Sequence, residues 1–175
     1  SQYGSWAMAL GLGKNVLVEN CVIISNRGNN ASGIYLEGGS VSNVIIRNCL
    51  FTHNSAQAQG SGFYIWGANV TIENCTIVSN KSAMVVRVSG ITTGTVVLAN
   101  NIICSNGVNF EGLACYLYAT NNCCSSSLAA YGPGNITDSP RFIDYPNWNF
   151  RLAPDSPCIN NGTNQDWMNG FVDQD

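Results

Sequence analysis

Charge is scarce in this sequence. Lys and Arg together number 7 and Asp and Glu number 10 among 175 residues, so charged residues make up 10% of the chain and the formal net charge is −3. Typical soluble domains carry roughly 25% charged residues. Because positive charge is not in surplus, we predict no nucleic-acid partner. An uninterrupted apolar run of roughly 18 residues is also missing, so we predict no membrane span.

Histidine is scarcer still. His53 is the single histidine, and the eight cysteines include no C-x-x-C pair and no Cys/His grouping with zinc-ligand spacing. We therefore predict no metal ion and no other cofactor. His53 stands in a row that serine otherwise occupies, at Ser25, Ser79 and Ser105, which favours a structural role for it.

What the chain has in abundance is a repeated phrase. The segment "NVTIENCTIVSN" (69–80) has near copies in "NVLVENCVIISN" (15–26) and "NVIIRNCLFTHN" (43–54), and a degenerate copy in "TVVLANNIICSN" (95–106). Aligned on the central asparagine, these copies lie 28, 26 and 26 residues apart, and a weaker one follows 21 residues later at Asn121. A period of this length indicates a solenoid.

Each repeat contains three short segments of alternating apolar residues and no helical periodicity, which predicts three strands per turn. Three strands in about 25 residues describe a parallel β-helix, whose equivalent strands stack roughly 4.8 Å apart. We predict coils in residues 1–127 and, in residues 128–175, a wrapping tail of the same domain. The second strand is predicted to point two apolar rows inward: Val16/Val44/Val70/Val96 and Val18/Ile46/Ile72/Leu98.

The central asparagine of each copy is predicted to form a corner, because asparagine tolerates a left-handed backbone. Stacking would align these residues and let their amides bond along the column as a structural ladder. The predicted ladder consists of Asn20, Asn48, Asn74 and Asn100, and a second column, Asn26, Asn54, Asn80 and Asn106, closes the third strand. Beside the first column, Glu19, Arg47 and Glu73 would alternate in charge and hold the register.

Two segments carry a family resemblance. The stretch "GIYLEGGSVSNVIIRNCLFTHNSA" resembles the coils of bacterial secreted and cell-surface right-handed parallel β-helix repeat proteins, and "GNITDSPRFIDYPNWNFRLAPDSPCINNGTNQDWM" resembles the region that precedes an anchoring domain in large members. The resemblance implies an all-β, right-handed parallel β-helix (solenoid) of about five coils of three short strands, with an irregular C-terminal tail packed on it. It also implies an extracellular or cell-surface location and no single activity.

One outer face has chemistry suited to a ligand. Aromatic residues of the first strand are predicted to face outward beside charged ones, where their rings could stack on sugars; the alternative is that the rings simply pack against each other. The candidate carbohydrate-binding residues are Tyr35, Tyr64, Trp66, Glu37 and Arg87.

No catalytic residue is predicted. Glu19 and Glu73 share a slot but lie two turns, roughly 9.6 Å, apart, with Arg47 between them, which favours a salt-bridge ladder over an acid/base pair.

The outer face of the third strand is unexpectedly apolar. Its slots read Val22/Leu50/Thr76/Ile102 and Ile24/Thr52/Val78/Cys104, and a patch of this size implies a cover. We expect the cover to be the chain's own tail, through Phe142, Ile143, Trp148, Phe150 and Leu152; the alternative is a second subunit.

The cysteines divide into two groups. Cys21, Cys49 and Cys75 are predicted to stack in the core as free thiols, because parallel Cβ vectors suit a disulfide poorly. We expect at least one disulfide in the second group, tying Cys158 to Cys123 or Cys124. The disulfide candidates are Cys104, Cys115, Cys123, Cys124 and Cys158.

Six N-x-S/T triplets are present, which matter if the protein is secreted by an organism that glycosylates them. Asn74 is assigned to the ladder and so is not expected to carry a glycan. The glycosylation candidates are Asn30, Asn69, Asn80, Asn135 and Asn161.

The expected role is an extracellular structural or adhesive module, non-catalytic, in a surface protein or a head-to-tail filament. Self-association end to end is expected because neither end of the coils shows an evident cap, and open sheet edges recruit further strands. The alternative is a carbohydrate-binding or polysaccharide-processing β-helix that uses the outer first-strand face and has glycans as partners.

Overall fold

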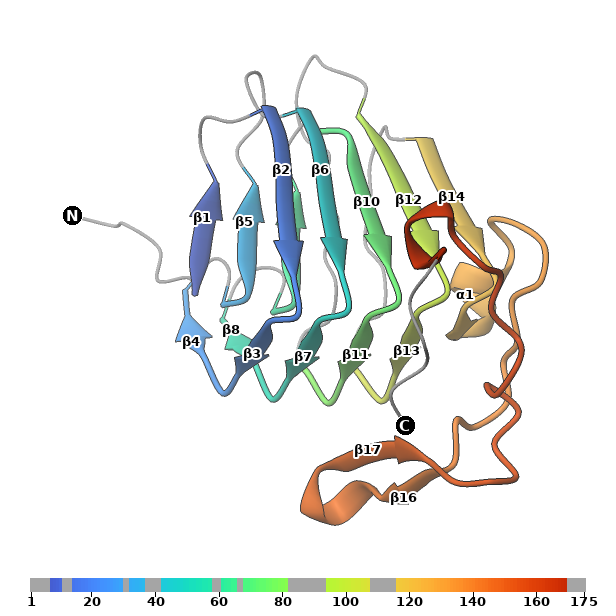
Figure 1. The fold of residues 1–175 in the computed structure, drawn as a ribbon. Coiled ribbons are helices and arrows are strands. Elements are labelled where there is room, and N and C mark those ends of the chain that lie inside the picture. The colour runs from blue at the N-terminus through green and yellow to red at the C-terminus, as the bar shows by residue number, and fades with distance from the viewer. Residues whose placement is uncertain are drawn as a thin grey trace.

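The chain winds into a parallel β-helix, with the strands of successive coils side by side and the tail along its flank (Figure 1). This computed structural model describes residues 7–10, 14–29, 32–36, 42–57, 61–65, 68–81, 94–107 and 116–169.

The strands recur in the order that the repeat predicts. The first coil contains β1 (Met8–Leu10), β2 (Lys14–Glu19), β3 (Val22–Ile24) and β4 (Arg27–Gly28), and the second β5 (Ile34–Leu36), β6 (Ser42–Arg47), β7 (Leu50–Thr52) and β8 (Ser55–Ala56). The third coil contains β9 (Phe63–Ile65), β10 (Val70–Glu73) and β11 (Thr76–Val78). The fourth contains β12 (Thr95–Ala99) and β13 (Ile102–Cys104), and the fifth β14 (Tyr116–Thr120) and β15 (Cys123–Cys124).

The tail has little regular structure. It contains the short helix α1 (Ser126–Ala129), the strands β16 (Phe142–Asp144) and β17 (Asn149–Leu152), and the 3-10 turns η1 (Tyr145–Asn147) and η2 (Asp166–Met168). Strands β16 and β17 pair as an antiparallel hairpin.

Three parallel sheets form the walls of the solenoid. The first sheet has the order β1-β5-β9, the second β14-β12-β10-β6-β2 and the third β15-β13-β11-β7-β3. Val70 is in register with Val44 on one side and with Val96 on the other. Residues 26 positions apart are therefore neighbours in space, which confirms the predicted stacking.

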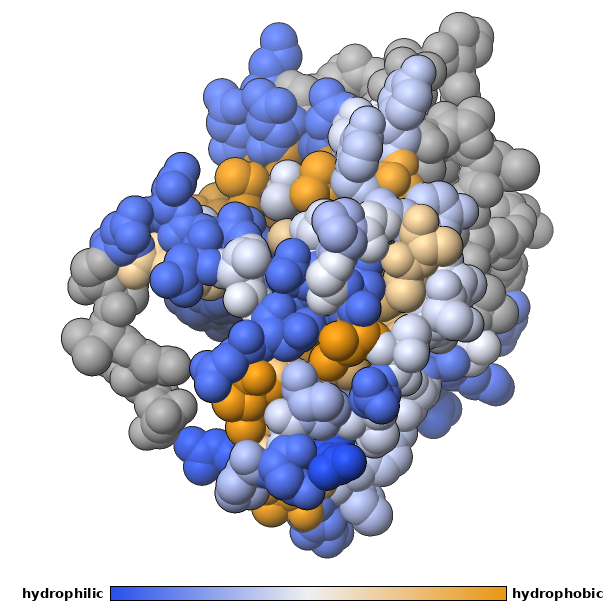
Figure 2. All heavy atoms as spheres, turned by 90° about the vertical axis from the view of Figure 1, so that its right-hand side faces the viewer, coloured by the Kyte–Doolittle hydropathy of each residue, from blue (hydrophilic) through white to orange (hydrophobic). Residues whose placement is uncertain are grey.

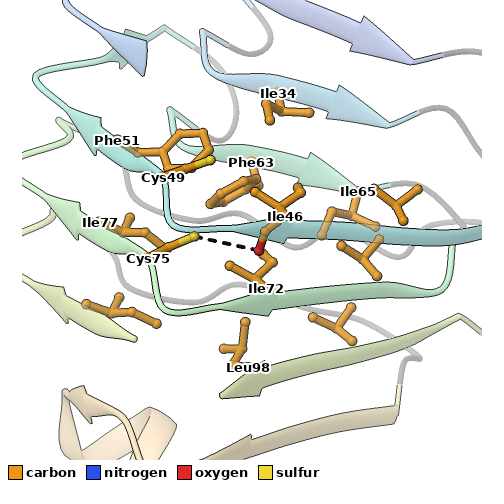
Figure 3. Packing of buried hydrophobic residues seen from close by; sticks show 14 of the residues in the cluster. Ile34, Ile46, Cys49, Phe51, Phe63, Ile65, Ile72, Cys75, Ile77 and Leu98 are labelled. Carbon is orange, nitrogen blue, oxygen red and sulfur yellow. Dashed lines mark hydrogen bonds between the residues drawn. The ribbon is translucent and has the colours of Figure 1, made fainter. Parts of the chain in front are cut away.

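The predicted inward rows form the core. Ile46, Ile72 and Leu98 of the second sheet are fully buried, and Figure 3 shows them facing the side chains of the other two sheets. Phe51 of the third sheet and Phe63 of the first sheet pack against each other in the interior, with ring centroids 4.3 Å apart. Burying each large apolar side chain stabilises the fold by roughly 1.5–3 kcal/mol.

The corner asparagines adopt the predicted conformation but do not form the predicted ladder. Asn20, Asn48, Asn74 and Asn100 have φ of 55°, 52°, 50° and 57°, so the left-handed corner is confirmed. No side-chain hydrogen bond joins these four, all of which are described, so the ladder assigned to them is wrong. A left-handed residue bends the chain sharply into the next sheet, and the amides of Asn20 and Asn48 lie at the surface.

The ladder lies one residue later. Inward-facing side chains at this position accept a hydrogen bond from the backbone N–H of the preceding coil, as Asn101 does from Cys75 and Asn122 from Asn101, both at 2.9 Å. They also donate to a carbonyl of that coil: Asn101 Nδ2 bonds Ile72 O at 2.9 Å, and Cys75 Sγ bonds Ile46 O at 3.6 Å (Figure 3). The column comprises Cys21, Cys49, Cys75, Asn101, Asn122 and Asn135.

A second buried ladder closes the third strand, as predicted. Asn54 Nδ2 bonds Asn80 Oδ1 at 3.0 Å, and Asn80 Nδ2 bonds Asn106 Oδ1 at the same distance. Asn26 joins the column through Asn54 Oδ1. His53 immediately precedes this ladder and is left-handed, with φ 56°. It therefore serves as a corner residue, in keeping with its predicted structural role.

The C-terminal end of the solenoid is capped, so the expectation that neither end has a cap is wrong here. Leu128 of α1 is fully buried and packs against the core. The carbonyls of Tyr131, Pro133 and Ile136 accept hydrogen bonds from the last coil and so imitate a further turn. Seen from this end, the surface is mostly hydrophilic, with hydrophobic residues in small separate patches (Figure 2).

The β16–β17 hairpin partly covers the third sheet. Tyr145 Oη lies 2.6 Å from Ser79 Oγ, and the Trp148 ring stacks on His53 with centroids 4.0 Å apart. Thr52 and Val78 of the apolar outer face are fully buried, whereas Val22 of the first coil is 64% exposed. The predicted cover by the tail is thus confirmed for the middle coils and wrong for the first.

Replacing Asn80 by alanine tests the ladder. The Asn80→Ala variant removes the side-chain hydrogen bonds to Phe51 O and to the backbone N–H of Asn54 in the interior, so we expect the free energy of unfolding to fall by about 2–4 kcal/mol. Asn69→Ala, at an exposed asparagine that accepts one backbone bond, should cost less than about 1 kcal/mol. Equal losses in urea titrations of the two variants would contradict the ladder's role.

Candidate functional site

Of the predicted carbohydrate platform on the first sheet, Tyr35 and Tyr64 are described. Tyr35 and Tyr64 stack on each other with centroids 5.2 Å apart and planes 15° from parallel, and Tyr64 is only 7% exposed. These two rings therefore pack as neighbours on the sheet, as the alternative interpretation had it. Glu37, Trp66 and Arg87 lie outside the described residues.

The outer face of the second sheet also presents this chemistry. We call two neighbouring outward rows of this sheet the second-sheet face. Tyr116 and Tyr118 at one end are 60% and 54% exposed, and Leu17 at the other is 51% exposed. The register joins one row as Asn15, Asn43, Asn69, Thr95 and Tyr116 and the other as Leu17, Ile45, Thr71, Val97 and Tyr118.

This face is uncharged and slightly hollowed. A shallow groove of about 290 Å³ runs between the rows and is lined in part by Asn43, Asn69, Thr95 and Val97. Asn43 Nδ2 bonds Asn15 Oδ1 at 3.1 Å, which aligns the amides along the row. Amides can bond hydroxyl groups and tyrosine rings can stack on apolar faces. The sequence signal for the tyrosines is the alternation in "YLYAT" (116–120), which the weak fifth repeat obscured.

Next to this face, the charge row anchors the tail. Arg47 Nε bonds Glu19 Oε1 at 2.6 Å, and Arg47 Cζ lies 4.3 Å from the centroid of the Trp167 ring. Glu73 is 6% exposed. Burial raises the pKa of Glu73, while the nearby Arg47 cation and the Trp167 indole oppose the rise. The indole N–H interacts with this carboxylate without reaching the geometry of a full hydrogen bond. The row thus binds η2 as well as holding the register.

A larger groove separates the hairpin from the coils. It has a volume of about 650 Å³, and the corner residues Asn20 and Asn48 line it opposite Trp148 and Arg151. Since these amides and this guanidinium can all donate hydrogen bonds, the groove could accommodate a polar group. Its wall is the exposed hairpin, so its shape depends on where the tail sits.

The carboxylates of the described coils, Glu19 and Glu73, are both engaged in the contacts with Arg47 and Trp167. Glu19 and Glu73 flank Arg47 in register, and in the tail Asp155 pairs with Arg141 at 2.8 Å. Within the described residues, no cluster of three or more His, Cys, Asp or Glu side chains could hold a metal ion. Over the same residues, no helix has the length and apolar character required to cross a bilayer.

The seven described cysteines are all free thiols; Cys115 lies outside the described residues. This confirms Cys21, Cys49 and Cys75 as core thiols. The expected disulfide is not formed between described cysteines, although the Cys123 and Cys158 thiols interact with each other. Cys124 belongs to the core instead.

The glycosylation candidates differ sharply in their surroundings. Asn80 is 1% exposed and part of a ladder. Asn135 Nδ2 donates to Ala119 O at 2.6 Å and to Gly132 O at 2.8 Å. Asn69 is exposed, and Asn161 is half-buried with its amide on Gly134 O; Asn30 lies outside the described residues. Neither Asn80 nor Asn135 can therefore accept a glycan without losing structural bonds.

Comparison with protein families agrees with the architecture. A family model described as "Right handed beta helix region" matches residues 3–132, which is most of the chain. The chain belongs to the right-handed β-helix family. Neither a curated protein nor a solved structure matches it significantly. The matched span includes all five coils of this β-helix and reaches into the cap, so family membership establishes the fold and not an activity.

The buried carboxyl of Glu73 should make stability depend on pH. Because its pKa is raised above the ordinary value of 4.5, the unfolded chain loses this proton first, and stability falls as pH rises through the raised pKa. Glu73→Gln removes this loss of stability. Thermal melts should therefore show that the stability of the variant relative to the wild type increases as pH increases. Glu19→Gln, which breaks the 2.6 Å pair with Arg47, should be less stable than the wild type at neutral pH. A gap between wild type and Glu73→Gln that stays constant with pH would refute this assignment.

Glycan occupancy should follow accessibility. When the chain is secreted from a glycosylating host, we expect a glycan on Asn69, whose Nδ2 can be modified while Oδ1 keeps its bond to the backbone N–H of Thr95 at 2.9 Å. Asn80 and Asn135 should remain unmodified in the folded protein. Glycopeptide mass spectrometry measures this directly, and high occupancy at Asn80 would contradict the buried ladder.

Proposed function

We propose that this β-helix is a non-catalytic, extracellular structural and adhesive module that binds through its second-sheet face. The observation that carries the proposal is the composition of that face: an uncharged row of amides and hydroxyls lies beside a largely apolar row, and each row ends in an exposed tyrosine. Most monomeric proteins expose no such contiguous apolar stripe without a use for it.

The rigidity of the module supports a structural role. The backbone of the face is hydrogen-bonded across five strands, and the two ladders bond the corners from coil to coil. A surface built in this way keeps its side chains at fixed spacing, which lowers the entropy lost on binding an extended partner. The resemblance of the coils and the tail to secreted β-helix repeat proteins supports an extracellular location.

The arrangement of carboxylates supports the non-catalytic part of the proposal. Glu19 and Glu73 are engaged by Arg47 and the Trp167 ring, so neither is placed to act as an acid or a base on a bound sugar.

The cap favours a module within a larger surface assembly over a head-to-tail filament. An incoming coil at the C-terminal end would have to displace Tyr131, Pro133 and Ile136 from the backbone N–H groups that they satisfy. Since buried N–H groups must stay paired, end-to-end stacking at this end would first require the cap to open.

A second candidate function, carbohydrate binding, is favoured by the same face. Tyr116 and Tyr118 lie two residues apart on β14 and point to one side, next to the row that contains Thr95 and Asn69. This pairing of rings with neutral hydrogen-bonding groups suits an uncharged glycan. The carbohydrate site expected on the first sheet is therefore proposed here for the second.

Binding of neutral glycans tests both functions. We expect the full chain to bind one or more neutral polysaccharides on an array, and the Tyr116→Ala/Tyr118→Ala double variant to lose about tenfold or more in affinity, because each aromatic contact contributes roughly 0.5–1.5 kcal/mol. Tyr131→Ala, at an exposed tyrosine on the cap, should bind like the wild type. Release of reducing ends by the wild type would contradict the non-catalytic role, and unchanged binding by the double variant would contradict the second-sheet face.

A further inference from the structure

Three cysteines from distant parts of the sequence gather beneath the tail. Cys123 on β15 faces outward in the row of Ile102, whereas its neighbour Cys124 pairs with Ile103 and faces the core. The Cys123 and Cys158 thiols interact with each other, and Cys123 Sγ donates a hydrogen bond to Asp138 O at 3.3 Å. Cys104, on the adjacent strand β13, completes the group.

Both of these thiols, Cys123 and Cys158, line a cavity. Its volume is about 260 Å³, and Cys123 and Cys158 line it together with Asn100, Asn121 and Asn161. Cys158 is half-buried and not sealed in the core. A small molecule can therefore approach Cys158 from the cavity, and Cys123 lies in the wall of the same cavity.

We propose that Cys123 and Cys158 form an oxidative cross-linking site that reacts with low-molecular-weight disulfides, such as oxidised glutathione, and fastens the tail to the last coil by a Cys123–Cys158 disulfide.

The reaction is an ordinary two-step thiol–disulfide exchange. The Cys158 thiolate attacks one sulfur of the small disulfide, forms a mixed disulfide and releases one small thiol. Cys123 then loses its proton to the solvent and attacks the Cys158 sulfur, which releases the second small thiol. The two protein thiols are oxidised to one disulfide, the small disulfide is reduced to two thiols, and the two protein protons end on those thiols.

The surroundings assign the two roles. The interaction with Cys123 lowers the pKa of Cys158, and burial and Asp138 oppose this only in part. The same interaction, with burial, raises the pKa of Cys123. Burial raises the pKa of Cys104 to about 11. The thiolate is the nucleophile, and Cys158 is half-buried whereas Cys123 is only 4% exposed. Cys158 therefore attacks first and Cys123 resolves the mixed disulfide.

The cross-link would act on contacts that are otherwise non-covalent. Beyond Cys158, the tail is held by Thr163, whose N–H bonds Asn100 Oδ1 at 2.9 Å and whose carbonyl accepts from Asn100 Nδ2 at 2.7 Å. Further on, Trp167 packs on Arg47. Anchoring Cys158 covalently keeps this segment close to its docking sites even when they open.

Oxidation of the full chain tests the proposal. After incubation with oxidised glutathione, we expect the chain to lose the mass of two hydrogen atoms, and a tryptic digest without reductant to link the peptide containing Cys123 to the one containing Cys158. Fragmentation of this linked peptide identifies the bonded cysteine in the wild type, with no variant required. The midpoint of thermal unfolding should rise by roughly 5–15 °C on oxidation and return on reduction.

Matched variants separate this pair from the other cysteines. Cys158→Ser and Cys123→Ser should lose the cross-link, and Cys158→Ser should also fail to form the initial mixed disulfide with glutathione. Cys124→Ser, at the adjacent inward-facing cysteine, should retain it. A cross-link from Cys158 to Cys104, Cys115 or Cys124 would overturn the proposal, as would a wild type that remains fully reduced while a small dithiol in the same tube is oxidised.

Discussion

A parallel β-helix must satisfy backbone groups at its corners, where the chain leaves one sheet and has not yet entered the next. A buried N–H or C=O without a partner costs roughly 1–3 kcal/mol, and the cost recurs in every coil. Here a left-handed residue makes the turn, and the next side chain points inward to bond the N–H and C=O of the coil before it. Two such columns, one at each end of the third strand, allow the sheets to pack around a continuous apolar core.

The residue type in the first column changes along the chain, whereas its hydrogen-bonding role stays the same. In the early coils cysteine fills the position, and Cys49 Sγ bonds Val18 O at 3.8 Å. In the later coils asparagine takes over, and Asn122 Nδ2 bonds Leu98 O at 3.0 Å. Sulfur is the weaker partner, so the coils joined by asparagine are held together more firmly. The last member, Asn135, lies in the cap, so the column ends by joining the cap to the last coil through hydrogen bonds.

The sequence predicted the repeat, the three strands, their register and the inward rows because all of these follow from a period of about 26 residues and the alternation within each strand. The ladder was misplaced by one position because periodicity identifies a column but not the direction of its side chains at a left-handed corner. The doublet Asn100-Asn101, repeated at Asn121-Asn122, was the available signal, since a polar residue there breaks an otherwise inward apolar row. The cap had no repeat to mark it, because its contacts depend on how the tail returns to the coils, and the weak fifth repeat obscured the tyrosines of the second-sheet face.

That return has a mechanical meaning. After leaving the fifth coil the chain runs back along the stack: Asn161 meets Asn121, Thr163 meets Asn100 of the fourth coil, and Trp167 rests on Arg47 of the second. A pull on the C-terminal end would therefore reach the second coil before it could peel the fifth from the stack. The force would be shared in shear by several contacts between the tail and different coils. Successive coils would therefore be protected from unwinding one at a time.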